Sequence, residues 1–182
     1  MLTILIGKSA AGKDSICNEL VKKYDFKRIV TYTTRPPRKG EVDGVDYHFI
    51  SDDTFLKMIE NDEFLEYRTY QASFGDVSYG SLKKDYLSDG KNLIILTPSG
   101  LEEVLKKLKD EPIRICSIYL KASDGVLIKR LKERGDAQEE IIRRLSCDNE
   151  DFKGVENEVV HVIVNDGTLN IPQLATYINT LI

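Results

Sequence analysis

Short runs of apolar residues alternate along the chain with longer segments in which apolar and charged positions mix. The apolar runs lie at 2–6, 92–96, 113–120 and 159–164. Segments with helical spacing of their apolar positions follow these runs, at 16–24, 101–110, 124–135 and 169–182. Continuous apolar runs are typical of strands buried on both faces, and an intervening helix places successive strands in parallel. The pattern predicts an α/β fold, a parallel sheet with helices on both faces.

Two segments interrupt this alternation. Residues 31–81 are rich in Thr, Tyr, Gly, Pro and charged residues, with strand-like stretches at 46–50 and 63–70, which predicts an inserted β-rich lobe. Residues 130–153 are polar with helical spacing and few apolar positions, which predicts a mobile helical lid. We expect one domain over 1–182, with its core at about 1–30, 82–129 and 154–182.

The first apolar run ends in a glycine-rich turn, GKSAAGKDSI, at residues 7–16. A glycine, four residues and then Gly-Lys, between a strand and a helix, predicts backbone amides that surround phosphate groups. Lys13 would place a positive charge beside the β- and γ-phosphates. The alternative is a glycine turn with a surface lysine. The phosphate-binding residues predicted here are Gly7, Lys8, Ser9, Ala10, Ala11, Gly12, Lys13, Asp14 and Ser15.

Composition and charge restrict the classes of partner. Of the 182 residues, 41% are hydrophobic and 31% are charged, as in ordinary soluble proteins. A net charge of −4 and a pI near 5.3 argue against a general nucleic-acid binder. The three cysteines lack CxxC spacing and fit reduced thiols, and no run reaches the ~18 apolar residues of a membrane span. We expect a soluble, cytoplasmic protein without nucleic-acid or membrane partners.

A second motif, TTRPPRKGEVDGVDYHF, occupies residues 33–49. Arg35 and Arg38 are separated by two prolines, which fix the backbone and hold two guanidinium groups at a set spacing. Such paired groups suit a phosphate with several free oxygens, and Tyr47 and Tyr79 would add hydroxyl groups. A basic surface loop is the alternative.

This motif resembles the guanylate kinase family, whose pattern Thr-Thr-Arg-x-Pro-Arg-x-Gly-Glu-x-x-Gly-x-Asp-Tyr-x-Phe it matches at every fixed position. Family-like segments follow at 63–67, 79–81, 130–135, 143–146 and 163–166. The resemblance implies a P-loop core, a nucleoside-monophosphate-binding lobe and a lid. It also implies transfer of the γ-phosphoryl group of ATP to GMP or dGMP, with Mg²⁺ as cofactor.

The resemblance assigns roles to individual positions. Glu66 is expected to accept the N1 and N2 hydrogens of guanine, since an ionised carboxylate only accepts hydrogen bonds. The acceptor-site residues implied are Thr31, Arg35, Arg38, Glu41, Tyr47, Glu66, Tyr79, Ser81 and Thr97. The catalytic residues implied are Lys13, Arg38, Arg130, Arg134 and Arg144, with Arg143 as a neighbour, and Asn165 is expected near the donor adenine.

Three departures from the family pattern stand out. Asp14 occupies the position where a phosphate loop usually carries a hydroxyl residue, so Asp14 or Ser15 is predicted to contact Mg²⁺, directly or through water. A first-turn acid that stabilises the helix dipole is the alternative role of Asp14. Thr97 stands where many family members carry an acid that helps to read guanine, which leaves the strictness of guanine specificity open. The stretch 66–79 also looks longer than in the family.

Other functions stay open at this stage. One is a nucleoside monophosphate kinase with different or relaxed base specificity, and another is a non-catalytic guanylate-kinase-like interaction module. Such modules typically have degraded phosphate loops and lids, whereas Lys13, Arg130, Arg134 and Arg144 are present here. A P-loop GTPase is disfavoured because the chain has no Asn-Lys-x-Asp segment. The sequence leaves both a monomer and a homodimer open.

Overall fold

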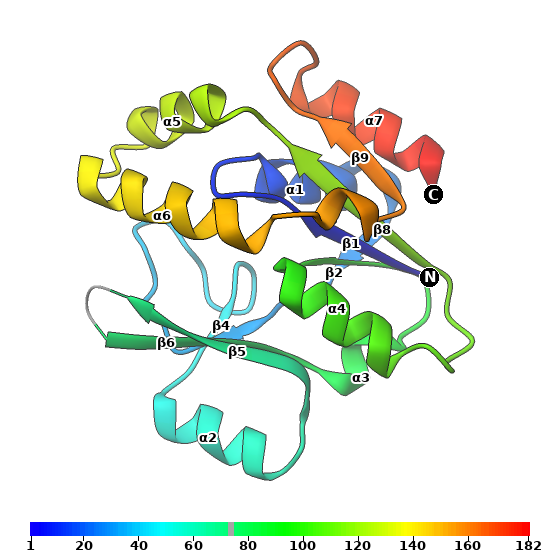
Figure 1. Cartoon of the computed structure of the whole chain (residues 1–182). Coiled ribbons are helices and arrows are strands. Elements are labelled where there is room, and N and C mark those ends of the chain that lie inside the picture. The colour runs from blue at the N-terminus through cyan, green and yellow to red at the C-terminus, as the bar shows by residue number, and fades with distance from the viewer. Residues whose placement is uncertain (73–74) are drawn as a thin grey trace. The chain divides into compact units, whose positions relative to one another are not determined.

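The structure, a computed structural model, describes residues 1–72 and 75–182 (Figure 1). It divides into two compact units. Unit 1 comprises Met1–Arg28, Gly90–Leu101 and Arg114–Ile182, and unit 2 comprises Ile29–Asp89 and Glu102–Ile113. The stretch expected to be longer than in the family, 66–79, includes residues 73–74, so that prediction lies partly outside the described residues.

Unit 1 is built on a parallel five-stranded sheet. Its strands are β1 (Leu2–Ile6), β2 (Phe26–Arg28), β7 (Lys91–Ile95), β8 (Ile115–Lys121) and β9 (His161–Val164), in the order β2-β7-β1-β8-β9. All four pairings are parallel, and Leu2 of β1 lies opposite Asn92 on one side and Ile115 on the other. The predicted parallel sheet is therefore confirmed. The pattern missed β2, because a three-residue strand is too short to show a period.

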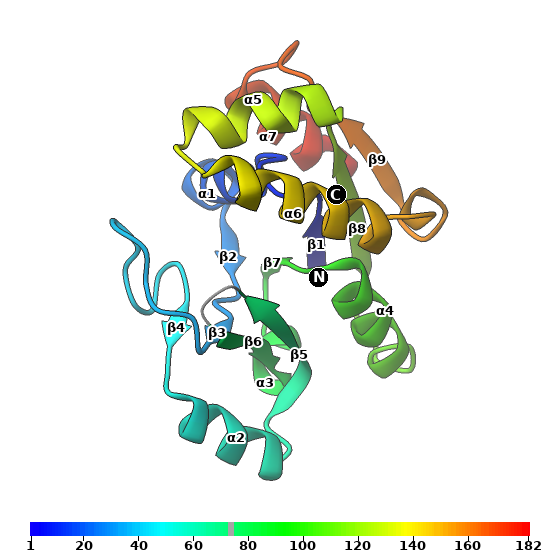
Figure 2. The ribbon, with the colours of Figure 1, turned by 60° about the vertical axis from the view of Figure 1, so that its left-hand side comes forward.

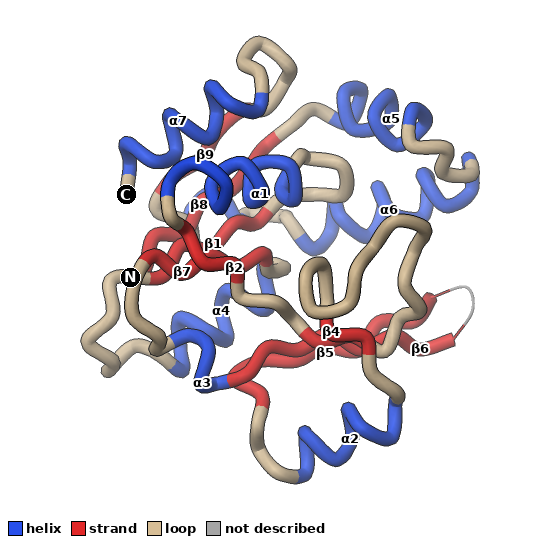
Figure 3. Tube along the Cα trace, turned by 180° about the vertical axis from the view of Figure 1, so that it is seen from behind, coloured by secondary structure: helices blue, strands red, loops and turns tan. Residues whose placement is uncertain are grey.

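Helices cover both faces of this sheet. Those of unit 1 are α1 (Lys13–Tyr24), α5 (Asp124–Glu133), α6 (Gln138–Asp151) and α7 (Ile171–Leu181), with a short 3₁₀ turn at Val155–Asn157. Helices α1 and α7 lie on one side of the sheet and α6 on the other (Figures 1 and 3). Ile16 and Leu20 of α1 and Ile178 of α7 are buried with Leu5 of β1 in one core. This core holds the strand and the helix on either side of the glycine-rich turn.

Unit 2 contains a second, four-stranded sheet with the order β4-β3-β6-β5. Its strands are β3 (Tyr32–Thr33), β4 (His48–Phe49), β5 (Phe64–Ala72) and β6 (Gly75–Leu82), and its helices are α2 (Asp52–Glu60) and α3 (Lys83–Tyr86). Strands β5 and β6 pair antiparallel, and α2 lies on one side of the sheet (Figure 2).

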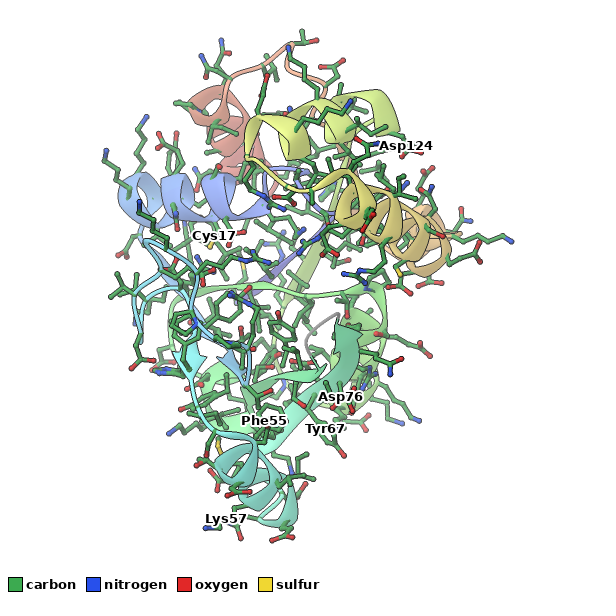
Figure 4. All side chains as sticks on the ribbon, turned by 90° about the vertical axis from the view of Figure 1, so that its left-hand side faces the viewer. Cys17, Phe55, Lys57, Tyr67, Asp76 and Asp124 are labelled. Carbon is green, nitrogen blue, oxygen red and sulfur yellow. The ribbon has the colours of Figure 1, made fainter. Side chains whose placement is uncertain are left out.

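Helix α2 was not predicted within this β-rich segment. It packs Phe55 and Met58 against Phe64 and Leu82, and Figure 4 shows Phe55 beside Tyr67, with ring centroids 6.4 Å apart. The Ser51 hydroxyl accepts from the Thr54 amide and caps the helix. That cap and the apolar positions three residues apart were readable signals.

One more helix, α4 (Pro98–Lys107), begins in unit 1 and ends in unit 2. Within the described residues, no helix combines the length and the apolar character that crossing a membrane requires.

Candidate active site

The glycine-rich turn between β1 and α1 has backbone geometry that restricts its residues. Gly12 has φ +97°, and a Cβ atom there would lie 2.7 Å from the Asn165 Nδ2. A Cβ atom at Gly7 would lie 2.8 Å from the carbonyl oxygen of Leu120. Ala10 has φ 62°, a left-handed conformation that non-glycine residues seldom adopt. Both glycines are therefore required by close approach, and Ala10 carries local backbone strain.

Lys13 is folded back over this turn. Its Nζ donates to the carbonyl oxygens of Gly7 at 2.6 Å and Lys8 at 3.1 Å. Desolvation by burial lowers the pKa of Lys13, while the nearby carboxylates of Asp14 and Asp148 act in the opposite direction. The Lys13 amine is thus held against the inner side of the turn.

Two side chains of α6 contact the same turn. The Ser9 amide donates to the Asp148 Oδ2 at 2.6 Å, and the Lys8 Nζ donates to the Asn149 Oδ1. Lys8 also pairs with Asp124, with a distance of 3.2 Å from Nζ to Oδ1. Sequence reasoning did not select these three residues of α5 and α6. An acidic side chain is not expected beside a predicted anion site, so the pattern gave no signal for Asp148.

A cavity of about 560 Å³ opens beside the turn. Predicted residues that line it are Ala10, Gly12, Lys13, Asp14, Ser15, Arg130, Arg134 and Asn165. Residues of its wall that sequence reasoning missed are Gly167, Leu169, Asn170 and Ile171, in the segment between β9 and α7 and at the start of α7. Their types carry no signal for a ligand, and only the fold brings them to the cavity.

Arg130 and Asn165 fix the wall of this cavity against the turn. The Arg130 guanidinium donates to the carbonyl oxygens of Ala10 at 3.3 Å and Asn165 at 3.1 Å. The Asn165 Nδ2 donates to the carbonyl oxygen of Ala11 at 2.7 Å. Three segments far apart in the sequence are therefore joined around one cavity.

The remaining lid arginines are bound to carboxylates. Arg134 donates from Nε to the Asp136 Oδ1 at 2.8 Å. Arg143 and Arg144 both donate to Glu140, from Nε at 2.8 Å and 2.6 Å. The hydrogen bond from Arg143 has the largest effect on the pKa of Glu140, and burial opposes it. Together with the hydrogen bond from Arg144, it lowers this pKa to about 2. Arg130 and Arg134 line the cavity. Arg144 is not among the described residues that line it.

Asp14 is exposed at the start of α1, and its Oδ1 accepts from the Arg28 NH2 at 3.1 Å. Within residues 1–72 and 75–182, no three His, Cys, Asp or Glu side chains form a group that could hold a metal ion. Asp14 and Ser15, the two residues after Lys13 in the sequence, both line the cavity and carry side-chain oxygens, as do Asn165 and Asn170.

The predicted phosphate cluster of unit 2 is organised by Glu41. The Arg35 NH2 donates to both Glu41 carboxylate oxygens, at 2.8 Å and 3.0 Å, and the Arg38 amide donates to the Glu41 Oε2 at 2.6 Å. The Arg35 guanidinium carbon lies 5.5 Å from the ring centroid of Tyr47, whose ring is 5.8 Å from that of Tyr79. The structure thus brings these five predicted residues together.

Arg35 in this cluster is buried and charged. Burial opposes its charge, but the hydrogen bond with Glu41 and the neighbouring Tyr79 outweigh it and raise the pKa of Arg35. The Arg35 Nε is buried without a hydrogen-bond acceptor among the described residues. A buried donor without a partner costs about 1–3 kcal/mol, which an oxyanion at this position would recover.

The predicted base-reading carboxylate, Glu66, is buried in the same unit with 5% of its surface exposed. The Ser81 hydroxyl donates to the Glu66 Oε1 at 2.5 Å. Burial raises the pKa of Glu66, and the hydrogen bond from Ser81 opposes this effect. The structure therefore brings Glu66 and Ser81 into direct contact.

Two predicted acceptor-site residues are placed differently. The backbone carbonyl oxygen of Thr31 accepts a hydrogen bond from the His48 amide nitrogen at 2.9 Å, a contact that any residue type could make. Thr97 lies in unit 1, where its hydroxyl accepts from the Gly100 amide at 3.2 Å at the start of α4.

A strand, a phosphate-binding type of turn and a helix, within a parallel sheet covered on both faces, define the class of P-loop nucleotide-binding proteins. A sequence model described as guanylate kinase matches residues 1–180. The chain belongs to the guanylate kinase family.

Individual relatives agree with this assignment. A guanylate kinase of Aster yellows witches'-broom phytoplasma is 36% identical over 177 residues, covering 93% of this chain and 81% of the relative. A guanylate kinase of Clostridioides difficile is 38% identical over 162 residues, covering 86% of this chain and 76% of the relative. The crystal structure of guanylate kinase from Anaplasma phagocytophilum has a TM-score of 0.74 at 24% identity, covers all of this chain and 83% of that one, and supports the fold.

Proposed function

We propose that the chain transfers the γ-phosphoryl group of ATP to GMP, giving ADP and GDP, and that it also accepts dGMP. The observation that carries this proposal is the pair of clusters in unit 2. One cluster contains the Arg35 guanidinium, the Arg38 amide and the Tyr79 ring, whose residue types suit a phosphate, and the other buries the Glu66 carboxylate. A phosphate-binding cluster and an acceptor for two N–H groups on one small unit match the two ends of GMP.

The chemistry requires positive charge and alignment rather than a base. Phosphoryl transfer passes through a loose transition state with negative charge on the equatorial oxygens. Lys13, Arg130 and Arg134 would stabilise that charge, with Arg144 released from Glu140 to join them. Arg35 and Arg38 would hold the acceptor phosphate, whose oxygen is already an anion and needs no proton removed.

The residues of the cavity suit a Mg²⁺ ion that takes only a few of its ligands from the protein. Mg²⁺ keeps several waters and is usually held by one or two protein ligands plus substrate phosphates, which agrees with the two oxygen-bearing side chains, Asp14 and Ser15, that follow Lys13 in the cavity wall. We propose that these two residues hold it, directly or through water. When bound, Mg²⁺ would neutralise phosphate charge. The Arg28 pair would orient the Asp14 carboxylate.

A coupled assay with ATP, Mg²⁺ and each nucleoside monophosphate tests the proposal. We expect turnover with GMP and dGMP and at most weak turnover with AMP, CMP and UMP. Turnover with none of them would favour an interaction module, and a preference for another base would reject the guanine assignment. Cytoplasmic location and oligomeric state stay predictions, which fractionation and light scattering can check.

The Arg38→Ala variant tests the acceptor site separately. A charged hydrogen bond is worth about 1.5–3 kcal/mol, so we expect about a 10- to 150-fold loss of kcat/KM for GMP with little change in ATP affinity. Lys39→Ala, one position along the same turn, is the matched control for the loss of one positive charge. An equal loss in both variants would remove Arg38 from the site.

A further inference from the structure

Three buried side chains of unit 2 form a hydrogen-bonded chain that the proposed reaction does not explain. The Tyr86 hydroxyl lies 2.6 Å from the Ser81 Oγ, which donates to the Glu66 Oε1 at 2.5 Å. Tyr86 and Ser81 have no exposed surface. Tyr86 comes from α3, so the helix that follows β6 supplies the outer end of the chain.

The direction of the protons in this chain follows from chemistry. A serine hydroxyl has one proton, and Ser81 gives it to Glu66. Tyr86 must then donate to Ser81, since two acceptors do not share a hydrogen bond. Burial, and next the charge of Glu66, raise the pKa of Tyr86 well above its ordinary value, so the phenol stays a donor at every physiological pH.

We propose that Tyr86 is a positioning residue that sets base specificity: by donating to Ser81 it aims the Ser81 proton at Glu66 and keeps that carboxylate an ionised, acceptor-only group. An ionised carboxylate accepts the adjacent N1 and N2 hydrogens of guanine. A protonated carboxyl presents one donor and one acceptor, the pattern that the adenine N1 and N6 edge complements. Tyr86 would therefore favour GMP over AMP without touching either. The inference rests on the proposed function for its substrate.

Charged groups around Glu66 also act on its ionisation, beside the hydrogen-bonded chain. The charged side chains that face it are Arg68 of β5, and Glu103 and Lys107 of α4. Arg68 and Lys107 both bind Glu103, with N–O distances of 2.6 Å and 2.7 Å, so Glu103 compensates one of the two positive charges. The positive charge that is left lowers the pKa of Glu66, in the same direction as the hydrogen bond from Ser81, and it is unchanged in the variants that test Tyr86. Among the described residues, only Ser81 donates to the Glu66 carboxylate, and it does so at Oε1.

The test compares Tyr86→Phe, which keeps the ring but loses the hydroxyl, with Tyr67→Phe as the control. Tyr67 lies in the same unit, and its hydroxyl takes no part in the hydrogen bonds from Tyr86 to Ser81 and Glu66. Carboxyl ¹³C NMR follows the titration of Glu66 without nucleotide, with the signal assigned by its loss in Glu66→Gln. Loss of a neutral hydrogen bond should raise the proton affinity of Glu66 about 2- to 12-fold in Tyr86→Phe only. With substrates, kcat/KM for GMP should begin to fall at a higher pH and the AMP-to-GMP ratio should rise at low pH, while KM for ATP is unchanged.

A second variant cuts the chain at its centre. Ser81→Ala should raise the proton affinity of Glu66 as well, and adding Tyr86→Phe should then change nothing, because Tyr86 acts through Ser81. An unmoved titration in Tyr86→Phe or in Ser81→Ala, or additive effects in the double variant, would overturn the proposal. If Tyr86→Phe were unfolded, an unmoved titration in Ser81→Ala would still overturn the proposal. These measurements need no turnover, so an absence of GMP kinase activity would refute the proposed function and leave the titration result standing.

Discussion

The contact of the Asp148 carboxylate of α6 with the glycine-rich turn leads to a prediction about ATP affinity. Its Oδ2 accepts the Ser9 amide at 2.6 Å, at a part-buried position where a phosphate oxygen of ATP would bind. An incoming phosphate must therefore replace an anion of this chain. Asp148→Asn keeps the shape and one oxygen acceptor but removes the charge, so we expect the variant to bind ATP more tightly.

The size of the effect follows from the two kinds of hydrogen bond. A bond to a charged group contributes about 1.5–3 kcal/mol and a neutral bond about 0.5–1.5 kcal/mol. In the variant, the hydrogen bond from the Ser9 amide to residue 148, which competes with ATP, is therefore weaker by about 1–1.5 kcal/mol. At 1.4 kcal/mol per tenfold, the Kd for ATP should fall about 5- to 12-fold.

Isothermal titration calorimetry of wild type and variant, with ATP alone and with ATP and Mg²⁺, measures this change. Asp151→Asn is the matched control, since Asp151 lies one turn further along α6 and is exposed. It removes the same formal charge without removing the contact to Ser9. An equal change of the Kd for ATP in both variants would mean that net charge alone, and not the contact to Ser9, causes the effect. Weaker ATP binding by Asp148→Asn only when Mg²⁺ is present would mean that Asp148 assists the cation, and would refute competition.

Three further predictions concern the framework of the site. Gly12→Ala should abolish ATP binding and lower the melting temperature, because its Cβ would lie 2.7 Å from the Asn165 amide at a φ of +97°; calorimetry and thermal melts with Ala11→Gly as control would check this. Glu140→Gln should lower stability at neutral pH, and the difference in stability from wild type should shrink as pH falls from about 4.5 toward about 2. The reason is that a group with a lowered pKa in the folded state stabilises the fold only while it is ionised. Equal differences in melting temperature at pH 7 and pH 2.5 would contradict this prediction. Thiol labelling at pH 7.5, read by mass spectrometry, should modify exposed Cys147 first, while Cys17 reacts only on unfolding because burial raises the pKa of Cys17 to about 11; early labelling of Cys17 would show that α1 opens.

The sequence was informative where a local pattern decides the structure. The apolar run at 2–6 and the glycine spacing after it predicted a strand, a turn and a helix, and all three are present. The arginines at 35 and 38 were matched to one phosphate site from their spacing, and the structure joins them through Glu41. These features depend on residues close together in the chain.

The sequence was less informative where contacts join distant segments. Asp148 reaches a turn almost 140 residues away, and no local rule selects a particular acid of a polar helix for that role. Tyr86 reads as an ordinary core tyrosine until its hydroxyl is seen beside Ser81. Helix α2 is different, since its Ser51 cap was available and the β-rich composition around it outweighed that signal.

The central place of β1 in its sheet has a consequence for synthesis on the ribosome. Its four apolar residues and Thr3 are made before its neighbours β7 and β8, which begin only at Lys91 and Ile115. At about 5–20 residues per second, β1 waits roughly 4–17 s for its first partner. The long strands of unit 2, β5 and β6, are neighbours in the chain and pair as soon as they emerge. The strand that leads into the glycine-rich turn is thus an apolar segment that the nascent chain must keep from aggregating until β7 emerges.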